Sequence, residues 1–167
     1  MDKAARKTAL QDLADKLGDE RASEIGRRFI SELLSPTELA QLTGWEISSI
    51  YDLLSGGNFR LTGRVGARRG GFWAIAPTKR LLPDQAPFLF DELNKEYGDD
   101  RASEIINDLL ADLVDVGEIS RSINVPTRTV RYRLNSGVGG SYAKKINAEA
   151  NAGTTWVVLK DAVTLLV

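Results

Sequence analysis

The chain contains no cysteine and no histidine among its 167 residues. Without these side chains it cannot form the usual zinc sites, a disulfide framework or a nucleophile activated by histidine. The remaining residue types show no converging set of acid, base and nucleophile. We therefore expect neither an enzyme nor a bound metal or cofactor. The lack of cysteine also fits a reducing compartment.

Long apolar runs are missing as well. No stretch approaches the roughly 20 apolar residues that span a bilayer. The N-terminal stretch MDKAARKTALQDLADKLGDE is charged throughout and lacks the apolar centre of a signal peptide. Hydrophobic residues make up 43% of the chain and charged residues 27%, a composition typical of folded globular proteins. We expect a cytoplasmic protein that makes no contact with a membrane.

The sequence repeats itself at an offset of 80 residues. Gly18 to Ile25 reads GDERASEI, and Gly98 to Ile105 reads GDDRASEI. Apolar positions also pair at this offset, among them Leu10 with Phe90, Leu13 with Leu93, Phe29 with Leu109 and Ile50 with Val130. Three of the five prolines lie between Pro77 and Pro87, which is typical of a linker. We predict two units, residues 1–80 and 81–167, each with its own core.

The start of a third helix in each unit is visible in both copies. Ser35-Pro36-Thr37-Glu38 has the S-x-x-E pattern of a capping box, with proline at the first helical position. Asp115 to Glu118 stands at the same place in the second copy. In each unit two earlier helices are predicted by apolar residues at helical spacing.

A second motif follows this capping box. Glu38 to Leu54 reads ELAQLTGWEISSIYDLL, with Ala40 four residues before Gly44 and Ile50 six residues after it. The second copy, EISRSINVPTRTVRYRL, has Ser120, Asn124 and Val130 at these places. A small residue, a left-handed turn and an apolar residue at this spacing suit two helices that cross at a tight turn. Both segments resemble the helix-turn-helix motifs of DNA-binding regulators, and VPTRTVRYRL is similar to recognition helices of many prokaryotic transcription factors.

An alternating pattern follows each motif and predicts a β-hairpin, over residues 58–65 and 72–75 in the first copy and 141–146 and 154–159 in the second. Three helices followed by a hairpin resemble the winged-helix arrangement. The resemblance implies a mainly α fold with β-hairpin wings, of the α+β class, in tandem winged helix-turn-helix domains. Residues 161–167 are expected to pack back on the second unit.

Charge is unevenly spread along the chain, although the net charge is only -1. Residues 36–80 carry a net charge of +3 and residues 115–147 a net charge of +4, whereas residues 81–114 carry -7. Positive charge therefore falls on the two helix-turn-helix and hairpin segments, and negative charge on helices behind them. A neutral protein with a basic face can still bind phosphates.

The resemblance implies sequence-specific binding of double-stranded DNA, in transcription regulation or in plasmid, phage or chromosome maintenance, with a location in the nucleoid. The first recognition helix has no cation and carries Asp52, so we expect the first hairpin to supply most of that unit's contacts. The residues expected to contact DNA are polar or basic side chains of the recognition helices and wings: Arg128, Thr129, Arg131, Tyr132, Arg133, Asn135, Lys144, Lys145, Ser48, Ser49, Tyr51, Arg60, Arg64, Arg68 and Arg69.

A second function class remains open. Tandem winged helices also serve as protein-interaction scaffolds, as in proteins resembling bacterial condensin accessory subunits or polymerase-associated subunits. The isoelectric point of about 5.6, the first recognition helix without a cation and the acidic middle of the chain favour this alternative. In that case the acidic helices would contact a protein partner or a second copy of the chain.

Overall fold

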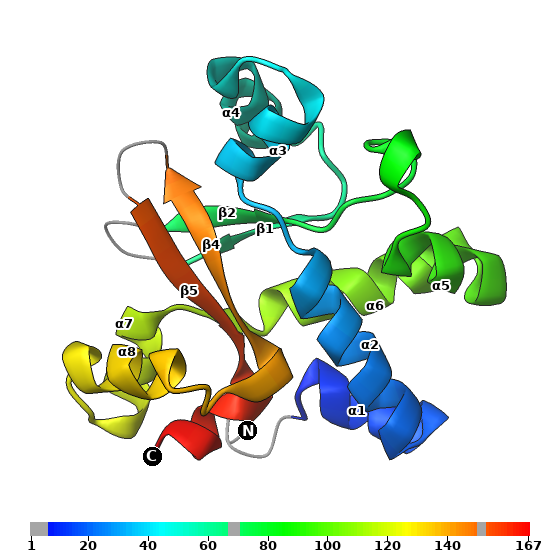
Figure 1. Cartoon of the computed structure of the whole chain (residues 1–167). Coiled ribbons are helices and arrows are strands. Elements are labelled where there is room, and N and C mark those ends of the chain that lie inside the picture. The colour runs from blue at the N-terminus through cyan, green and yellow to red at the C-terminus, as the bar shows by residue number, and fades with distance from the viewer. Residues whose placement is uncertain (1–6, 67–70, 150–152) are drawn as a thin grey trace.

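The computed structural model describes residues 7–66, 71–149 and 153–167 (Figure 1). In the first half, four helices precede a pair of strands: α1 (Ala9–Leu17), α2 (Asp19–Glu32), α3 (Pro36–Thr43), α4 (Ile47–Ser55), β1 (Thr62–Val65) and β2 (Phe72–Ile75). The second half follows the same order with one further short strand: α5 (Leu89–Tyr97), α6 (Asp99–Ala111), β3 (Leu113–Val114), α7 (Val116–Ile123), α8 (Thr127–Asn135), β4 (Ala143–Glu149) and β5 (Gly153–Leu159).

Short 3-10 helices join or end these elements: η2 (Pro83–Gln85), η3 (Gly140–Tyr142) and η4 (Lys160–Leu166). The prediction of a mainly helical α+β protein is confirmed. The prediction that the C-terminal residues pack back on the second half is also confirmed, because Ala162 and Leu166 of η4 are buried against α7 and α8.

Both predicted capping boxes are present. The Ser35 hydroxyl accepts from the backbone N–H of Glu38 at 3.2 Å, while the Glu38 carboxylate accepts from the Ser35 N–H at 2.8 Å. Asp115 and Glu118 form the same pair of bonds at the start of α7. Each box satisfies two N–H groups that the helix itself leaves unpaired, which fixes where α3 and α7 begin.

The turns after α3 and α7 are left-handed, as their sequences predict. Gly44 has a φ of 76° and Asn124 a φ of 56°. Among the described residues, Asn124 is the only non-glycine with a positive φ. Asparagine tolerates this conformation better than most side chains, so both copies can begin the next helix after the same sharp turn.

The sheet topology is the same in the two halves. In the first half the residue just before α3, Leu34, exchanges backbone hydrogen bonds of 2.9 and 2.8 Å with Ile75 of β2. In the second half β3 pairs antiparallel with β5, and β5 pairs with β4. In both halves, therefore, the returning strand of the hairpin lies between its partner strand and the segment that precedes the third helix.

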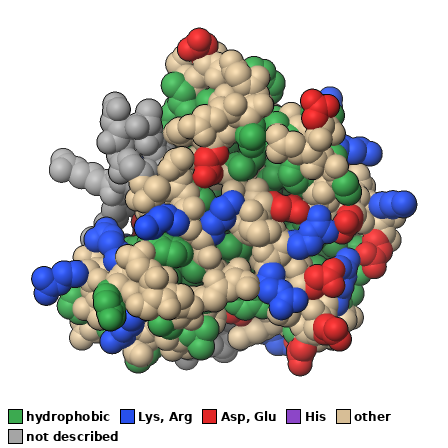
Figure 2. Space-filling view, in the orientation of Figure 1, with side chains coloured by type: hydrophobic (Ala, Val, Ile, Leu, Met, Phe, Trp, Pro, Cys, Tyr) green, Lys and Arg blue, Asp and Glu red, His purple; other side chains and the backbone are tan. Residues whose placement is uncertain are grey.

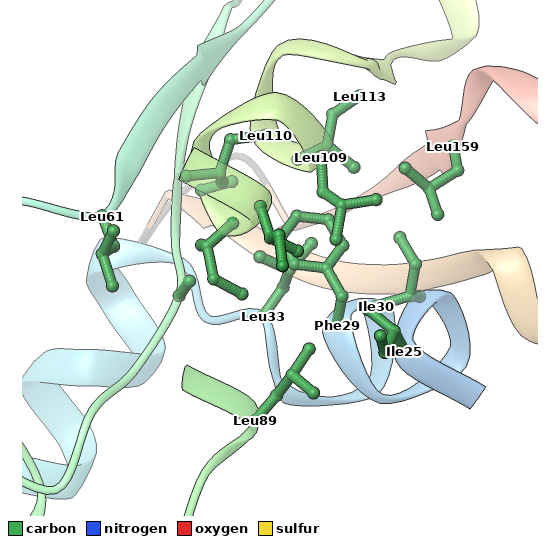
Figure 3. Close-up of a cluster of buried hydrophobic side chains, with 14 of the residues drawn as sticks. Ile25, Phe29, Ile30, Leu33, Leu61, Leu89, Leu109, Leu110, Leu113 and Leu159 are labelled. Carbon is green, nitrogen blue, oxygen red and sulfur yellow. The ribbon is translucent and has the colours of Figure 1, made fainter. Parts of the chain in front are cut away.

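The largest buried cluster joins the two halves (Figure 3). Ile25 and Phe29 of α2 pack in it together with Leu89 of α5, Leu109 of α6 and Leu159 of β5. The prediction that each half has a separate core is therefore wrong. Helices α1, α2, α5 and α6 each bury one apolar face, and these faces meet in a common centre. The boundary between residues 80 and 81 stays a prediction.

Two smaller clusters each belong mainly to one pair of helices, α3 with α4 and α7 with α8. Leu39, Ile50 and Leu54 pack against β2 and the linker in the first half. In the second half Val130 and Leu134 pack against α7, β5 and η4. Each crossing pair of helices is thus held to the rest of the protein by a small apolar cluster of its own, and the opposite face of the pair remains exposed.

Contacts between the halves are reciprocal. The N–H of Leu89, at the start of α5, donates to the Glu32 carboxylate at 2.8 Å, and the N–H of Ala9, at the start of α1, donates to the Asp112 carboxylate at 2.6 Å. Ala9 and Leu89 are 80 residues apart in the sequence, as are Glu32 and Asp112. Each half therefore caps the first helix of the other, so the repeat in the sequence is also a repeat of contacts.

Candidate nucleic-acid interface

Helix α8 separates an anchored face from an exposed one. Val130 and Leu134 are 0% and 2% exposed, whereas Arg128 and Arg131 lie on the exposed surface. Tyr132 is 72% exposed. Among the described residues, neither arginine has an acidic partner within ion-pair distance. The two guanidinium groups remain available to an external anion.

The other residues expected on α8 have different surroundings. The Arg133 guanidinium donates to the backbone carbonyl of Leu166, so this side chain fixes the end of η4 to α8. Thr129 is half-buried and Asn135 is exposed at the C-terminal end of the helix. Fewer of the side chains expected to contact DNA are therefore exposed on α8 than the sequence predicts, because Arg133 is held by η4 and Thr129 is half-buried.

Helix α4 lies at the corresponding place in the first half and has a different surface. Ser48, Ser49 and Asp52 are exposed, and Ile50 anchors the helix. Tyr51 is half-buried and packs against the cluster beneath α4. A helix that presents serine hydroxyls and one carboxylate offers hydrogen bonds to a partner and repels phosphate at one point.

The hairpins hold their cations over tryptophan rings. The Arg64 guanidinium carbon lies 5.7 Å from the centre of the Trp73 ring, and Lys145 Nζ lies 5.6 Å from the centre of the Trp156 ring. In both hairpins the two residues are direct cross-strand partners. The ring positions the cation on the hairpin face through a cation–π contact. Neither tryptophan is among the interface residues expected from the sequence. The sequence signal that could have found them is that each copy has one tryptophan on the strand that follows the hairpin turn.

Two of the predicted hairpin cations instead connect the halves. Arg60 donates to both carboxylate oxygens of Asp99, at 3.2 and 2.8 Å, and to the Ser103 hydroxyl at 2.7 Å. The hydrogen bond raises the pKa of Arg60 and lowers the pKa of Asp99. Arg60 is therefore already paired with an acid of α6. Arg68 and Arg69 lie outside the described residues.

Lys144 is the second cation that connects the halves. Its Nζ donates to the backbone carbonyls of Ser31 and Leu33, at 2.9 and 2.7 Å, at the C-terminal end of α2. Burial lowers the pKa of Lys144 below its ordinary value. An amine that satisfies two helix-end carbonyls in this way is held in place and has little freedom to reach a phosphate.

The arrangement of these pieces is visible in Figure 1, where α3 and α4 lie at the top, α7 and α8 at the lower left, and the two hairpins between them. Strands β2 and β4 contact each other, so the hairpins lie side by side. In Figure 2 the Lys and Arg side chains over α7 and α8 have no red neighbours, whereas both signs mix over α2 and α5. Exposed cations occur on both sides of the molecule, and in this view those over α7 and α8 are the ones that stand apart from acidic side chains.

Comparison of the chain with family models, with curated proteins and with solved structures returned no match. The described residues contain no helix long and apolar enough to cross a membrane. Within the same ranges, no three acidic side chains are grouped in a way that could hold a metal ion.

Proposed function

We propose that the chain is a sequence-specific double-stranded DNA-binding protein made of two winged-helix units. The order of elements in each half supports this proposal, as do the left-handed turns at Gly44 and Asn124 and the strand order. The observation that carries it is the exposed face of α8, where Arg128 and Arg131 lie three residues apart without an acidic partner among the described residues. Residues at this spacing project from the same side of a helix.

In this function α8 enters the major groove. Arg128 or Arg131 donates to O6 and N7 of a guanine, a pairing that distinguishes guanine from the other bases. Arg64 and Lys145, positioned by their tryptophans, contact phosphates on either side and add affinity without sequence preference. Helix α4 contributes less than α8, because it brings hydroxyls and a carboxylate to the same surface. The two units therefore act unequally on one stretch of duplex.

The test compares variants on a duplex selected from a random library and on a scrambled duplex of equal length. Arg131→Ala should lose about 1–3 kcal/mol of binding free energy on the selected duplex and much less on the scrambled one. Lys145→Ala should weaken both alike and lower the slope of log K against log salt by about one unit. Lys95→Ala removes one positive charge from exposed α5 and is the matched control.

The results can contradict the proposal in two ways. If Arg131→Ala loses equal affinity on both duplexes, α8 binds phosphates and does not recognise bases. If the unsubstituted chain binds neither duplex at about 50 mM salt, where electrostatic contacts are strong, the DNA-binding proposal is wrong.

One observation favours a scaffold as the second candidate function. Leu42 and Trp45, on either side of the turn between α3 and α4, are each 45% exposed beside the cation-free helix α4. Large exposed apolar side chains at one place are typical of protein contacts. Sedimentation of the full chain and of Trp45→Ala tests whether this surface joins two copies, with a loss of dimer in the variant as the expected result.

A further inference from the structure

A cavity lies where the two halves meet, on a side that the DNA-binding proposal does not use. Its volume is about 540 Å³, and its walls come from residues 58–62, 75–81 and the helices α5 and α6. This volume is within the range of small-molecule sites, about 300–1,000 Å³. In Figure 1 α5 and the linker after β2 lie at the right, on the opposite side of the molecule from α7 and α8. An occupant would contact both halves at once.

The wall of this junction cavity combines apolar and polar side chains. Phe90 is 7% exposed and Leu61 is 4% exposed, and the half-buried Phe59 lies beside them in the wall. Thr78 and Asn94 add a hydroxyl and an amide. Walls that join apolar side chains to polar and charged ones suit a compact molecule that has an apolar or aromatic body and a polar or charged group.

The acidic residues of the cavity already have partners. The Asp91 carboxylate accepts hydrogen bonds from the backbone N–H groups of Lys79, at 3.0 and 3.2 Å, and Phe88, at 2.9 Å. Asp99 is paired with Arg60. The Asp91 charge is stabilised by neutral N–H groups, and the Asp99 charge is balanced by the Arg60 guanidinium.

Positive charge exceeds negative charge at the cavity, because three cations, Arg60, Lys79 and Arg80, line it with two acids. The side chains of Lys79 and Arg80 are exposed and line the cavity. Neither has an acidic partner within ion-pair distance among the residues that the structure describes. The excess of positive charge, together with two cations that have no acidic partner, favours an anion over a cation in the cavity.

The second half shows that the fold does not require this space to be open. At the corresponding place η3 packs against α2, and the Tyr142 hydroxyl donates to Ser23 at 3.1 Å. A ring carbon of Tyr142 lies 3.1 Å from where a Cβ on Gly26 would stand, so the missing side chain makes room for the ring. In the first half Arg60 reaches the equivalent serine, Ser103, while the space beside it stays open.

We propose that the junction cavity binds a small organic anion with an apolar or aromatic body. The apolar wall takes the body, and Lys79 and Arg80 pair with the charged group. Because the site spans both halves and exists only in the folded chain, an occupant raises the melting temperature, and the gain grows with the logarithm of its concentration above the dissociation constant. This binding is independent of DNA, so it can be tested separately from the proposed function.

The experiment uses two fluorescent probes that share one aromatic body, anilinonaphthalene sulfonate, which is an anion, and neutral phenylnaphthylamine. With the full chain the anionic probe should bind saturably, with one molecule per chain and more tightly than the neutral probe. Lys79→Ala combined with Arg80→Ala should weaken the anion about tenfold and leave the neutral probe unchanged. The control variant, Arg27→Ala with Lys95→Ala, removes the same charge from exposed positions outside the cavity and should leave both affinities unchanged.

A second substitution fills the cavity. Asn94→Trp should abolish binding of both probes, whereas Asn107→Trp, at an exposed position of α6 that does not line the cavity, should bind as the unsubstituted chain does. Amide chemical-shift changes on adding the anionic probe to the unsubstituted chain should be confined to the cavity wall, which tests the site even if a variant does not fold. Shifts centred elsewhere, equal loss of both probes in the charge variant, or full binding to folded Asn94→Trp would each overturn the proposal.

Discussion

Substitution of Phe29 by alanine tests whether the two halves share one core. Phe29 is 2% exposed and packs in the cluster that contains residues of both halves. Removal of a buried phenyl ring costs about 3–5 kcal/mol, the sum of lost burial and the cavity that remains. With a urea dependence of about 2 kcal/mol per molar, the midpoint of unfolding should fall by roughly 2 M.

The assay places the reporter in the other half. In a background of Trp45→Phe and Trp73→Phe the remaining tryptophan, Trp156, belongs to β5 and packs beside α7, α8 and η4. If the core is shared, the Trp156 fluorescence and the helical circular dichroism should show the same lowered midpoint for Phe29→Ala. Ser48→Ala, at an exposed position of α4, should change the stability by less than about 0.5 kcal/mol and serves as the control.

One result would refute this reasoning. If Phe29→Ala shifts the circular dichroism of part of the chain while the Trp156 transition keeps its original midpoint, the second half is stable without the first. The halves would then unfold independently, although their apolar faces are in contact.

Two further predictions concern charged groups. Lys144→Met should lower the free energy of unfolding in urea by about 1–3 kcal/mol, because two helix-end carbonyls lose their donor. The control, Lys145→Met, should lower it by less than about 1 kcal/mol. Equal losses in the two variants would contradict the special role of Lys144. Partial burial, and then repulsion by neighbouring acids, raises the pKa of Asp108, so its contribution to stability is present at low pH and is lost as pH rises through that raised pKa. Asp108→Asn should therefore raise the free energy of unfolding near neutral pH, by at most about 0.5 kcal/mol because this side chain is exposed. The gain, measured by thermal unfolding at several pH values, should disappear as the pH falls below about 4. A gain that persists in acid would contradict this assignment.

Local features of this fold were predictable from the residues themselves. The capping boxes at Ser35 and Asp115 and the turns at Gly44 and Asn124 depend on residues within a few positions of each other, so their spacing predicts them. The offset of 80 residues predicts that the same elements recur in the same order, and they do. The anchored face of α8, with Val130 and Leu134, follows from helical periodicity alone.

The partners of long side chains were not predictable in the same way. By residue type and sequence position, Arg60 and Lys144 look like hairpin cations that face a phosphate. The sequence gives no sign that they bond to the other half. Their partners lie 39 and at least 111 residues away in the chain. A flexible cation pairs with whatever acceptor the packed elements bring within reach, so its role is decided after folding.

The sequence by itself determined which segments are helical, where they begin and turn, and that the unit occurs twice, because these properties depend on short-range spacing and on capping chemistry. Only the tertiary structure decided that the two units share one apolar centre, since each unit exposes helix faces that are buried only against the other. It also decided which cations stay exposed on α8 and the hairpins and that a cavity remains at the junction. These features depend on the relative placement of elements that the chain separates by tens of residues, and no local pattern encodes that placement.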